Sequence, residues 1–577
     1  MIGLIAVTAA GRAAAARLAE AWPDETRQYD GPAATALPEA FGDADAVVVF
    51  LAVGATVRLL APLLGGKQTD PGVVCVDEAL RFAVPVTGAH AGGANDLARR
   101  VAAVLGGEPV ITTASDAAGT VALDEFGADL GFVIEPGSDL AAVGTAVLSG
   151  QRVTFSTDRT WPLPPLPPNV VTGDPEPAVP AIIVTDRQAP ARPEPTVVYR
   201  PPSLVVGLGA SRGVPAAEIG ALIDQALATA GLSPLSVRAA ATVDLKQDEA
   251  GLLAAVRGHG WPLSLFPAAD LARVPVPNPS ETVRAAVGTP SVAEAAAFLA
   301  AGHPASLIVP KQTSPHATVA VARRACQGRL AIVGIGPGAR DLLTPRAVAE
   351  LRRARIVVGL DQYLRQVEDL LRPGTTVRSS GLGQEQERAA AAVADAAAGH
   401  AVALIGSGDA GIYAMGSPAL ETLATLATAG VSTEVVGVPG VTAALAAAAL
   451  LGAPLGHDHA MISLSDLHTP WEVIERRVAA AADADLVVCF YNPASGERDW
   501  QLRKAMTVLA GRRPPETPVG WVRDASRPGQ SVATATLATF DPAVADMRTL
   551  VIVGSSRTRL VAGRMITPRE YRWAAAP

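Results

Sequence analysis

Short apolar runs alternate with alanine-rich amphipathic stretches along the whole chain. The first run, Met1–Thr8, is followed by a turn at Gly11 and a predicted helix over Ala13–Glu20, and two further runs lie at Ala46–Leu51 and Val73–Val76. Apolar runs of about four to eight residues between helical stretches are typical of strands buried on both faces of a sheet. The pattern predicts an α/β protein with largely parallel sheets, and no short fixed period indicates a solenoid.

Two breaks divide this pattern into three blocks. From Trp161 to Pro202 proline is dense, which excludes long helices and suits short strands, loops and a linker. The second break lies near Arg323–Arg329, where a helix-like segment is expected to end at Gly328 and a strand to begin at Leu330. We therefore expect a multidomain protein with three blocks: an N-terminal and proline-rich middle region at 1–200, an α/β domain at 203–325 and a further α/β domain at 329–577.

Composition limits the class of protein. The 577 residues are 49% hydrophobic and 18% charged, and the net charge of −8 is not accompanied by a basic cluster, so nucleic acid is not expected as a partner. Cys75, Cys326 and Cys489 lie far apart without a CxxC pair, which disfavours disulfides and zinc and is typical of a reducing compartment. The apolar N-terminus lacks a basic region, and Val441–Leu455 is too short to span a bilayer, so we expect a buried helix there and a cytoplasmic protein without a membrane partner.

The block that begins at Arg329 contains three glycine-rich turns, each after an apolar run. They lie at Gly334–Gly338, Gly406–Tyr413 and Gly437–Thr442. Glycine lets the backbone approach a ligand closely, although one such turn is equally often a plain tight turn, and no Gly-Lys-Ser/Thr of a P-loop follows. Three turns at strand ends of one sheet would converge where α/β proteins bind ligands.

Several phrases in this block carry a specific resemblance. Ser407–Met415, Ser463–Trp471, Phe490–Pro493 and Gly554–Ser556 resemble the precorrin-3B C(17)-methyltransferase branch of the tetrapyrrole methyltransferase family, with Ala410 where many members carry proline. The resemblance covers essentially all of 329–577. It implies two α/β subdomains, the cofactor S-adenosylmethionine, a homodimer, and methylation of precorrin-3B or cobalt-factor III at carbon 17 with contraction of the ring to precorrin-4.

The same resemblance implies a set of cofactor-binding residues in the three turns. Backbone N–H and C=O groups there would hydrogen-bond the polar ends of the methyl donor without side-chain bulk. Asp409 either faces the sulfonium cation or the macrocycle, or caps its own turn. The expected set is Gly334, Gly336, Pro337, Gly338, Gly408, Asp409, Gly411, Ile412, Tyr413, Pro439, Gly440 and Thr442.

Other polar residues of this block each have two interpretations. Asp466 and His468 are candidates for the acid–base steps of ring contraction, or form a polar pair in a loop. His457 and His459 are two residues apart, which indicates an exposed turn more often than a metal site, and no metal is expected. Four arginines either bind the rim carboxylates of the substrate or are solvated on the surface: Arg498, Arg523, Arg527 and Arg548.

The first two blocks carry a second resemblance. His90 lies in a Gly/Ala-rich turn, Thr87–Asn95, ahead of the segment Val110–Asp116, and the second block contains Val206–Gly213 and Asp244–Glu249. These segments resemble the cobalt-precorrin-5A hydrolase family, which opens a lactone on the macrocycle and releases a two-carbon aldehyde. The resemblance covers most of 1–325, and residues 125–200 match it poorly.

The chemistry of this half has open alternatives. An imidazole in such a turn suits acid–base work, so His90 is the catalytic candidate, or it is structural. The family usually has Ser-Gly directly before this histidine, where Gly88-Ala89 stands here. Lys246 and Glu249 are three residues apart, as in a surface ion pair on a helix.

The sequence as a whole predicts a fusion of two activities of cobalamin biosynthesis, in which one site raises the local concentration of substrate near the other. A first alternative makes residues 1–325 a non-catalytic tetrapyrrole-binding module that serves one methyltransferase. A second keeps the methyltransferase fold but gives it another acceptor, a protein histidine or ribosomal RNA. The low basicity and the phrase Ser465–Trp471 count against that acceptor.

Overall fold

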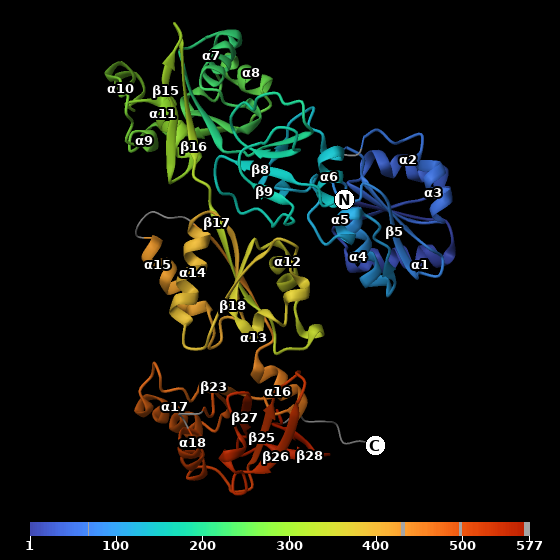
Figure 1. Cartoon of the computed structure of the whole chain (residues 1–577), viewed down its shortest axis with the longest axis vertical. Helices are drawn as coiled ribbons and strands as arrows, with labels where there is room; N and C mark the ends of the chain where they lie inside the picture. The colour runs from blue at the N-terminus through green and yellow to red at the C-terminus, as the bar shows by residue number, and fades with distance from the viewer. Residues whose placement is uncertain (67–68, 428–432, 496–498, 570–577) are drawn as a thin grey trace. The chain divides into compact units, whose positions relative to one another are not determined.

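A computed structural model describes residues 1–66, 69–427, 433–495 and 499–569. The chain forms two compact units (Figure 1). Unit one comprises residues 1–326 with 372–374, and unit two comprises 327–371 and 375–577. Within the described ranges, no helix combines the length and the apolarity that a membrane span needs.

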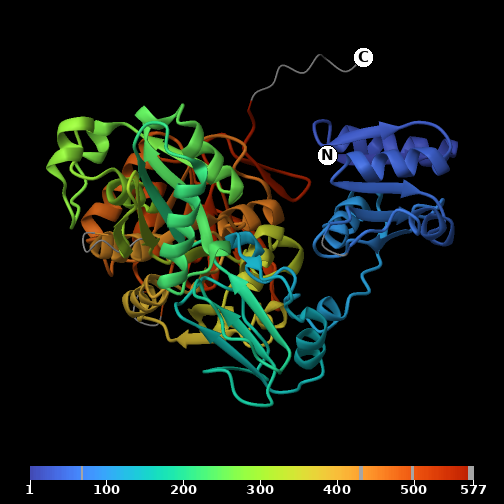
Figure 2. The same ribbon diagram turned by 90° about the horizontal axis from the view of Figure 1, so that it is seen from above.

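Unit one begins with a six-stranded sheet of order β2-β1-β3-β4-β5-β6. All neighbouring strands are parallel except β4 and β5. Alternate residues of β3 face two different cores, one with α1 and α4 and one with α2 and α3, so helices cover both faces (Figure 2). The predicted first strand and helix are confirmed, but the turn expected at Gly11 is wrong, because α1 begins at Ala9 and Gly11 lies inside it. The elements are β1 (Ile2–Ala6), α1 (Ala9–Ala21), β2 (Thr26–Tyr29), α2 (Ala33–Asp43), β3 (Ala46–Phe50), α3 (Val53–Leu60), β4 (Gly72–Val76), β5 (Phe82–Thr87), α4 (Ala94–Leu105) and β6 (Glu108–Pro109).

The proline-rich stretch lies in a second sheet of unit one, of order β7-β11-β10-β8-β9. Its neighbouring strands are parallel except β7 and β11. The aromatic rings of Phe126, Phe155 and Tyr199 meet edge-on in its core. Short strands and loops were expected here, but the stretch belongs to a packed sheet and does not serve as a linker. The elements are α5 (Ala114–Ala117), η1 (Ala128–Leu130), β7 (Val133–Ile134), α6 (Leu140–Leu148), β8 (Val153–Thr157), β9 (Val170–Thr172), β10 (Ala181–Val184) and β11 (Thr196–Arg200).

The third sheet of unit one has the order β14-β13-β12-β16-β15. The prediction of a helix that ends at Gly328 is wrong. Residues 317–324 form strand β16, which is hydrogen-bonded to β12 on one side and to β15 on the other. The β-branched Val319 and Val321 are fully buried in it, and such residues favour strands. The elements are β12 (Leu204–Ala210), α7 (Ala216–Thr229), η2 (Pro234–Ser236), β13 (Val237–Val243), η3 (Asp244–Lys246), α8 (Ala250–Gly258), β14 (Leu263–Phe266), α9 (Ala268–Leu271), α10 (Glu281–Val287), α11 (Val292–Ala301), β15 (Ala305–Thr313) and β16 (Ala317–Arg324).

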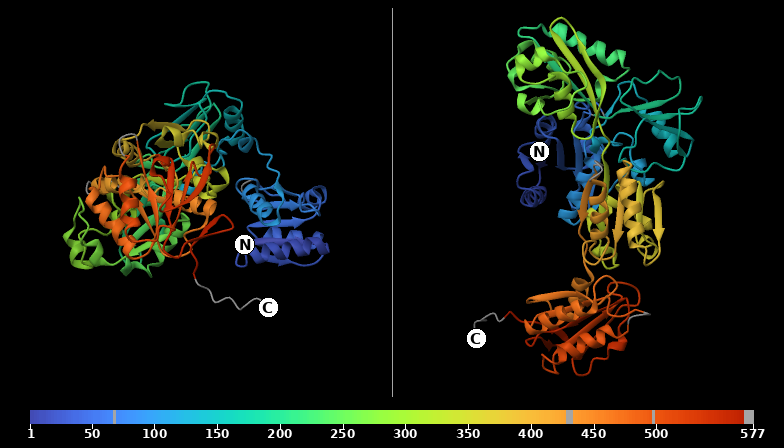
Figure 3. Two further views of the ribbon diagram at one scale, coloured as in Figure 1. Left: turned by 90° about the horizontal axis from the view of Figure 1, so that it is seen from below. Right: turned by 90° about the vertical axis from the view of Figure 1, so that its left-hand side faces the viewer.

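Unit two opens with an entirely parallel sheet of order β19-β18-β20-β17-β21, drawn in yellow and orange in Figure 3. Strand β17, which pairs with β20 and β21, begins at Gly328, two residues before the predicted start. The elements are β17 (Gly328–Gly334), η4 (Arg340–Leu342), α12 (Pro345–Arg353), β18 (Ile356–Leu360), α13 (Asp361–Leu364), η5 (Glu368–Leu370), β19 (Thr376–Ser380), α14 (Glu385–Ala397), β20 (Ala401–Gly406), α15 (Gly416–Ala427) and β21 (Thr433–Val438).

The second large sheet of unit two has the order β23-β24-β27-β25-β26. Among its described strands, only β23 and β24 are parallel neighbours. The prediction of largely parallel sheets is therefore wrong for this sheet. Short connections, such as the one between β25 and β26, join antiparallel neighbours. The buried alanine-rich helix is confirmed as α16. The elements are α16 (Ala443–Leu451), β22 (Gly452–Ala453), β23 (His459–Ser463), α17 (Trp471–Asp483), β24 (Val487–Tyr491), α18 (Gln501–Ala510), β25 (Pro518–Arg523), β26 (Ser531–Thr536), η6 (Pro542–Val544), β27 (Thr549–Val553), β28 (Arg559–Val561) and β29 (Arg564–Ile566).

Candidate active sites

The three glycine-rich turns of unit two meet at the carboxyl ends of β20, β17 and β21, which are neighbours in the sheet. The N–H of Gly336 donates to the carbonyl of Gly408 at 3.0 Å, and the N–H of Gly408 donates back at 2.7 Å. A Cβ on Gly440 would lie 2.1 Å from the Gly408 oxygen and 2.8 Å from the carbonyl carbon of Gly334. Because glycine has no Cβ, the three backbones approach one another directly.

Asp409 ties two of these turns together. Its Oδ1 accepts a hydrogen bond from the N–H of Gly411 at 2.8 Å, and its Oδ2 accepts one from the N–H of Gly440 at 3.0 Å. Asp409 is absent from the described residues that line the neighbouring cleft. Of the two interpretations of this carboxylate, the geometry favours the cap of the turn.

A cleft of ≈ 640 Å³ lies beside the three turns. Its volume is in the range of about 300–1,000 Å³ that is usual for small-molecule sites. Five of the predicted cofactor residues line it: Pro337, Gly408, Ile412, Tyr413 and Thr442. The opposite wall comes from the second large sheet and includes Tyr491, Asn492, Asp524, Arg527 and Arg548.

Two tyrosines join the turns to the second sheet. The hydroxyl of Tyr491 lies 2.6 Å from that of Thr442 and accepts the N–H of Ala444 at 3.0 Å. Tyr413 donates to the carbonyl of Met461 at 2.8 Å, and the two tyrosine rings lie 5.1 Å apart. Burial raises the pKa of both phenols, so both stay neutral at physiological pH and hold the cleft by hydrogen bonds.

Backbone strain is concentrated at this cleft. Of eight non-glycine residues with positive φ in the described chain, four lie at or beside it: Tyr413, Asn492, Asp524 and Ser526. A non-glycine residue in this region costs on the order of 1–3 kcal/mol, and such residues cluster at functional sites. Most of the positive-φ residues described in unit two therefore gather at the cleft, which supports it as the functional part of this unit.

Arg527 reaches from the second sheet to the first two turns. Its Nε donates to the carbonyl of Pro337 at 2.5 Å and its second guanidinium nitrogen donates to Ser407 Oγ at 2.8 Å. A Cβ on Gly338 would lie 2.5 Å from the Cγ of Arg527, so glycine makes room for this arginine. Arg527 therefore holds the turns in place and does not lie solvated on the surface.

The other predicted arginines are arranged around buried Asp524. Arg523 lies 3.2 Å and Arg548 lies 3.3 Å from its Oδ2, and Arg523 also pairs with Asp546 at 2.8 Å. The bond to Asp546 raises the pKa of Arg523. Arg548 also lines the cleft, which leaves it able to meet a substrate carboxylate. Arg498 lies outside the described residues.

The structure does not bring Asp466 and His468 to the cleft. Asp466 accepts a hydrogen bond from Gln501 at 3.0 Å, His468 is exposed, and both are absent from the described lining residues. Their acid–base role stays a prediction. His457 and His459 are also exposed, and the described ranges contain no group of three residues placed to hold a metal ion.

In unit one, His90 lies in the turn between β5 and α4 with its side chain only 10% exposed. Its Nδ1 is 3.4 Å from Asp124 Oδ1, and its Nε2 is 3.2 Å from Ser115 Oγ and 3.4 Å from Asp116 Oδ2. The hydrogen bond to Asp124 raises the pKa of His90 more than burial lowers it. The predicted catalytic histidine thus sits among groups that suit acid–base chemistry.

Asp116 is fixed by three donors. Thr113 Oγ1 donates at 2.6 Å, Asn95 Nδ2 at 3.0 Å and Arg99 at 2.7 Å. Although burial acts to raise it, these bonds lower the pKa of Asp116, so this carboxylate stays ionised. The sequence pattern singled out His90 and the segment up to Asp116 but gave no sign of Asp124, which follows 34 residues after the histidine.

The pair Lys246–Glu249 exists but is not a surface pair on a helix. The ammonium and carboxylate are 3.3 Å apart, with side chains 16% and 9% exposed. Lys246 ends a 3₁₀ turn, and Glu249 precedes α8 and accepts the N–H of Gly213 at 2.7 Å. The pair therefore links the two motifs Val206–Gly213 and Asp244–Glu249 at the ends of β12 and β13.

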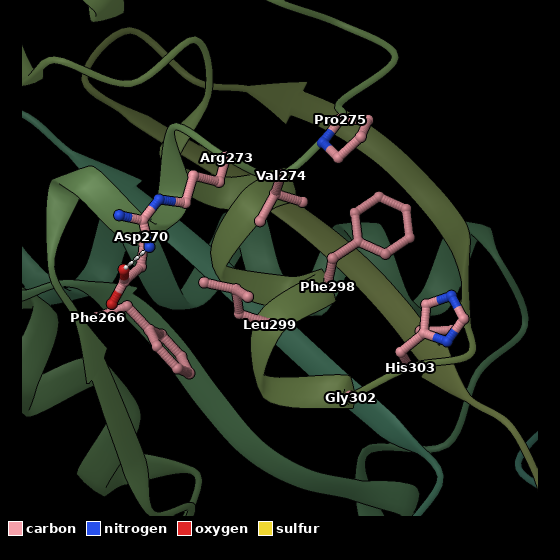
Figure 4. Close-up of a pocket in the computed structure, with 10 residues that line it drawn as sticks. Phe266, Asp270, Arg273, Val274, Pro275, Phe298, Leu299, Gly302 and His303 are labelled. Atoms are coloured by element: carbon pink, nitrogen blue, oxygen red, sulfur yellow. Dashed lines mark hydrogen bonds and ion pairs between the residues drawn. The ribbon is translucent and has the colours of Figure 1, made fainter. Parts of the chain in front are cut away.

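A second cavity of ≈ 620 Å³ lies beside the third sheet of unit one, and its lining includes residues of α9 and α11 (Figure 4). Phe266, Val274, Phe298 and Leu299 give it a largely apolar lining. Asp270 accepts from Arg273 at 3.3 Å at its edge. Such a lining can cover hydrophobic surface of a ligand, but this cavity lacks the paired acid and base found at His90.

Family models match four consecutive segments of the chain. Residues 35–116 match the N-terminal segment of cobalamin synthesis G, 121–201 the cobalamin biosynthesis central region, and 204–322 the C-terminus of cobalamin synthesis G. Residues 329–541 match the tetrapyrrole (corrin/porphyrin) methylases. The expectation that residues 125–200 match this family poorly is therefore wrong, because the central-region model matches residues 121–201. The segment contains many proline-rich loops, but its short strands form a sheet.

Named relatives cover each half. The chain is 46% identical over 242 residues to the Salmonella typhimurium protein named Probable cobalt-factor III C(17)-methyltransferase, covering 42% of this chain and 99% of the relative. It is 41% identical over 253 residues to precorrin-3B C(17)-methyltransferase of Sinorhizobium sp, covering 43% and 99%. It is 34% identical over 312 residues to cobalt-precorrin-5A hydrolase of Priestia megaterium, covering 51% and 83%. The crystal structure of the methyltransferase CobJ aligns at 37% identity and TM-score 0.40, covering 42% of this chain and 100% of that one.

Proposed function

Because the chain belongs to the tetrapyrrole methylase family in its C-terminal part and to the cobalamin synthesis G family in its N-terminal part, we propose that it is a two-part enzyme of cobalamin biosynthesis. Unit two methylates carbon 17 of precorrin-3B or cobalt-factor III, with contraction of the ring to precorrin-4, and uses S-adenosylmethionine. Unit one opens the lactone of cobalt-precorrin-5A.

The meeting of the three turns beside the cleft carries the proposal for unit two. The residues present fit S-adenosylmethionine, because the cleft has sufficient volume and its lining includes the hydroxyls of Ser407 and Thr442 as hydrogen-bonding groups for the polar ends of the methyl donor. When bound, this group supplies a methyl carbon activated by the positive charge on sulfur.

The protein's own residues then position the reactants. Methyl transfer to an electron-rich ring carbon depends chiefly on alignment and on exclusion of water. Arg527 fixes the turns through Pro337 and Ser407, and neutral Tyr491 holds Thr442 toward the cleft. Arg548, at the cleft wall beside Asp524, is placed to bind a rim carboxylate of the macrocycle.

Mass spectrometry of the product tests this activity. The full chain is incubated with precorrin-3B, and in parallel with its cobalt analogue, plus S-adenosylmethionine. We expect a gain of one methyl group and the absorption spectrum of a contracted ring. A folded protein that binds no S-adenosylmethionine in calorimetry and adds no methyl group to either substrate contradicts the proposal for unit two.

The buried His90 between Asp124 and the pair Ser115 and Asp116 supports hydrolysis in unit one. The alternative, a non-catalytic tetrapyrrole-binding module, is favoured by the apolar cavity near Phe298. The variant His90→Ala separates them, since lactone opening is lost only if unit one is catalytic, whereas methylation persists in both cases. His259→Ala is the matched control, because His259 also pairs with an aspartate, at 3.0 Å, away from this site.

We also propose a homodimer formed through unit two and a domain division at 1–200, 203–325 and 329–577. The dimer rests on the family resemblance, and the division on the change of sheet after each boundary. Light scattering of the full chain tests the dimer. Limited proteolysis that cuts first near residues 201–203 and 326–328 supports the division, and first cuts inside the sheets contradict it.

A further inference from the structure

We propose that unit one works through a covalent intermediate on Ser115, with Ser115 as nucleophile, His90 as general base and Asp124 as the carboxylate that orients the imidazole. The inference rests on the proposed hydrolase function of unit one and specifies its chemistry. It assigns catalytic roles to Ser115 and a positioning role to Asp124, two residues outside the turn that contains the histidine.

The geometry is that of a nucleophile, a base and an orienting acid in a row. Ser115 Oγ lies 3.2 Å from Nε2 of His90, and Asp124 Oδ1 lies 3.4 Å from Nδ1 on the other side of the ring. If Nδ1–H donates to Asp124, Nε2 carries the lone pair that accepts the Ser115 hydroxyl proton. The distances are at the long end of hydrogen bonds, as in catalytic groups that tighten when substrate binds.

All three residues of the row are at least partly buried. The side chains of His90 and Asp124 are 10% and 8% exposed, so their mutual orientation is held by packing. Ser115 is also partly buried, in the short segment Ala114–Ala117. The three groups come from three successive segments of the chain.

Asp116 has a different part from Asp124. It faces Nε2, at 3.4 Å, and not Nδ1, and three donors already occupy it: Thr113, Asn95 and Arg99. It remains an anion and stabilises the imidazolium that forms when His90 takes a proton. Asp124 faces the other ring nitrogen, Nδ1, also at 3.4 Å, and in the proposed row it is the residue that orients the imidazole.

The reaction balances with water as the sole co-reactant. Ser115 Oγ attacks the lactone carbonyl while its proton moves to Nε2; the new ester bond forms, the ring C–O bond breaks, and the Nε2 proton passes to the departing oxygen. Water then attacks the ester and gives a proton to Nε2, the ester C–O bond breaks, and that proton returns to Oγ. For the lactone opening alone, the net change is lactone plus water to a hydroxy acid.

A fluorophosphonate probe tests the nucleophile directly, without the natural substrate. The full-length protein is treated with the probe and its peptides are analysed by mass spectrometry. We expect the phosphonyl adduct on Ser115, no adduct in Ser115→Ala, and a labelling rate at least about 100-fold lower in His90→Ala. The matched controls Ser149→Ala and His259→Ala retain wild-type labelling, since Ser149 only caps its own helix end and His259 pairs with Asp224.

Lactone opening by the same variants gives the second measurement. Ser115→Ala should lower kcat at least about 100-fold, and Asp124→Asn should lower kcat and shift the pH profile while KM changes little. Thermal unfolding confirms that each variant is folded. Wild-type lactone opening without an adduct on Ser115, or Ser115→Ala within about twofold of wild type, overturns the proposal in favour of direct attack by water.

The two levels of proposal fail in different ways. An adduct on Ser115 that depends on His90, in a protein that leaves cobalt-precorrin-5A intact, sustains the nucleophile and refutes the assigned substrate. Lactone opening that is lost in His90→Ala but kept in Ser115→Ala sustains the hydrolase and refutes the covalent intermediate. Absence of both the adduct and the activity overturns both.

Discussion

Replacing Gly440 by alanine tests whether the three turns must touch for unit two to bind its methyl donor. The new Cβ would lie 2.1 Å from the carbonyl oxygen of Gly408 and 2.8 Å from both the carbon and the oxygen of Gly334. Since non-bonded atoms rest at about 3.5–4.0 Å, the turns must separate by roughly 1 Å. Overpacking of this kind costs about 1–3 kcal/mol, which, if it falls on the bound geometry, is roughly a 5- to 150-fold loss of affinity.

Calorimetry with S-adenosylmethionine measures this loss, and urea unfolding shows whether the fold survives. The matched control is Gly437→Ala, in the adjoining strand β21, where an added Cβ meets nothing within 4 Å; its Kd should stay within about twofold of wild type. A folded Gly440→Ala protein with an unchanged Kd would refute the claim that the contact between the turns forms the binding site. A Gly437→Ala protein that loses binding equally would refute the stated cause.

Three further predictions concern single polar groups. Arg527→Met should weaken S-adenosylmethionine binding about tenfold in calorimetry. Arg527→Lys should not restore the affinity, because one ammonium cannot replace the two directed guanidinium bonds, and full affinity in either variant contradicts the role of Arg527 in holding the turns. The pKa of His90 is raised, so the neutral imidazole that acts as base forms only at a pH above the ordinary histidine pKa of about 6.5. The value of kcat/KM for lactone opening should therefore rise with pH through a pKa above about 6.5, and this rise should move to lower pH in Asp124→Asn. A pH profile that does not move in Asp124→Asn contradicts the role of Asp124. Glu294→Gln should lower the free energy of unfolding by about 1–3 kcal/mol in urea titrations. Glu294 is fully buried, and its two carboxylate oxygens accept hydrogen bonds from the backbone and side-chain N–H groups of Asn278 and from the backbone N–H of Lys311.

The parts of the fold that were predictable are those set by local pattern. The apolar run Ala46–Leu51 corresponds to β3 because a run buried on both faces has few alternatives to a central parallel strand. Alanine-rich segments were the weak point, because alanine has the highest helix propensity and so a strand that contains it is easily taken for a helix. A helix was expected to end at Gly328, but the chain before it forms β16, which pairs with β12 and β15, and this pairing is a long-range effect absent from the local pattern.

The candidate sites divide along the same line. The glycine turns were found because each follows its own strand, and parallel neighbours bring strand ends together. Arg527 was one arginine among four, and its contact with Pro337 spans 190 residues. Asp124 was missed for the same reason, because its contact with His90 joins the turn after β5 to a later turn, 34 residues along the chain. Sequence pattern locates the backbone that shapes a site, whereas the side chains that complete it come from folding.

Both proposed sites are completed across a boundary between sheets within one unit. In unit two the turns of the parallel sheet receive Arg527 and Tyr491 from the other large sheet. In unit one His90, from the segment that matches the N-terminal family model, receives Asp124 from the segment that matches the central region. A protein truncated after residue 120 would keep the turn and the histidine but lose the carboxylate that orients it. Because the site at His90 depends on two family segments, the N-terminal and central-region segments of unit one behave as halves of one site, whereas both sheets that form the site of unit two belong to one family segment.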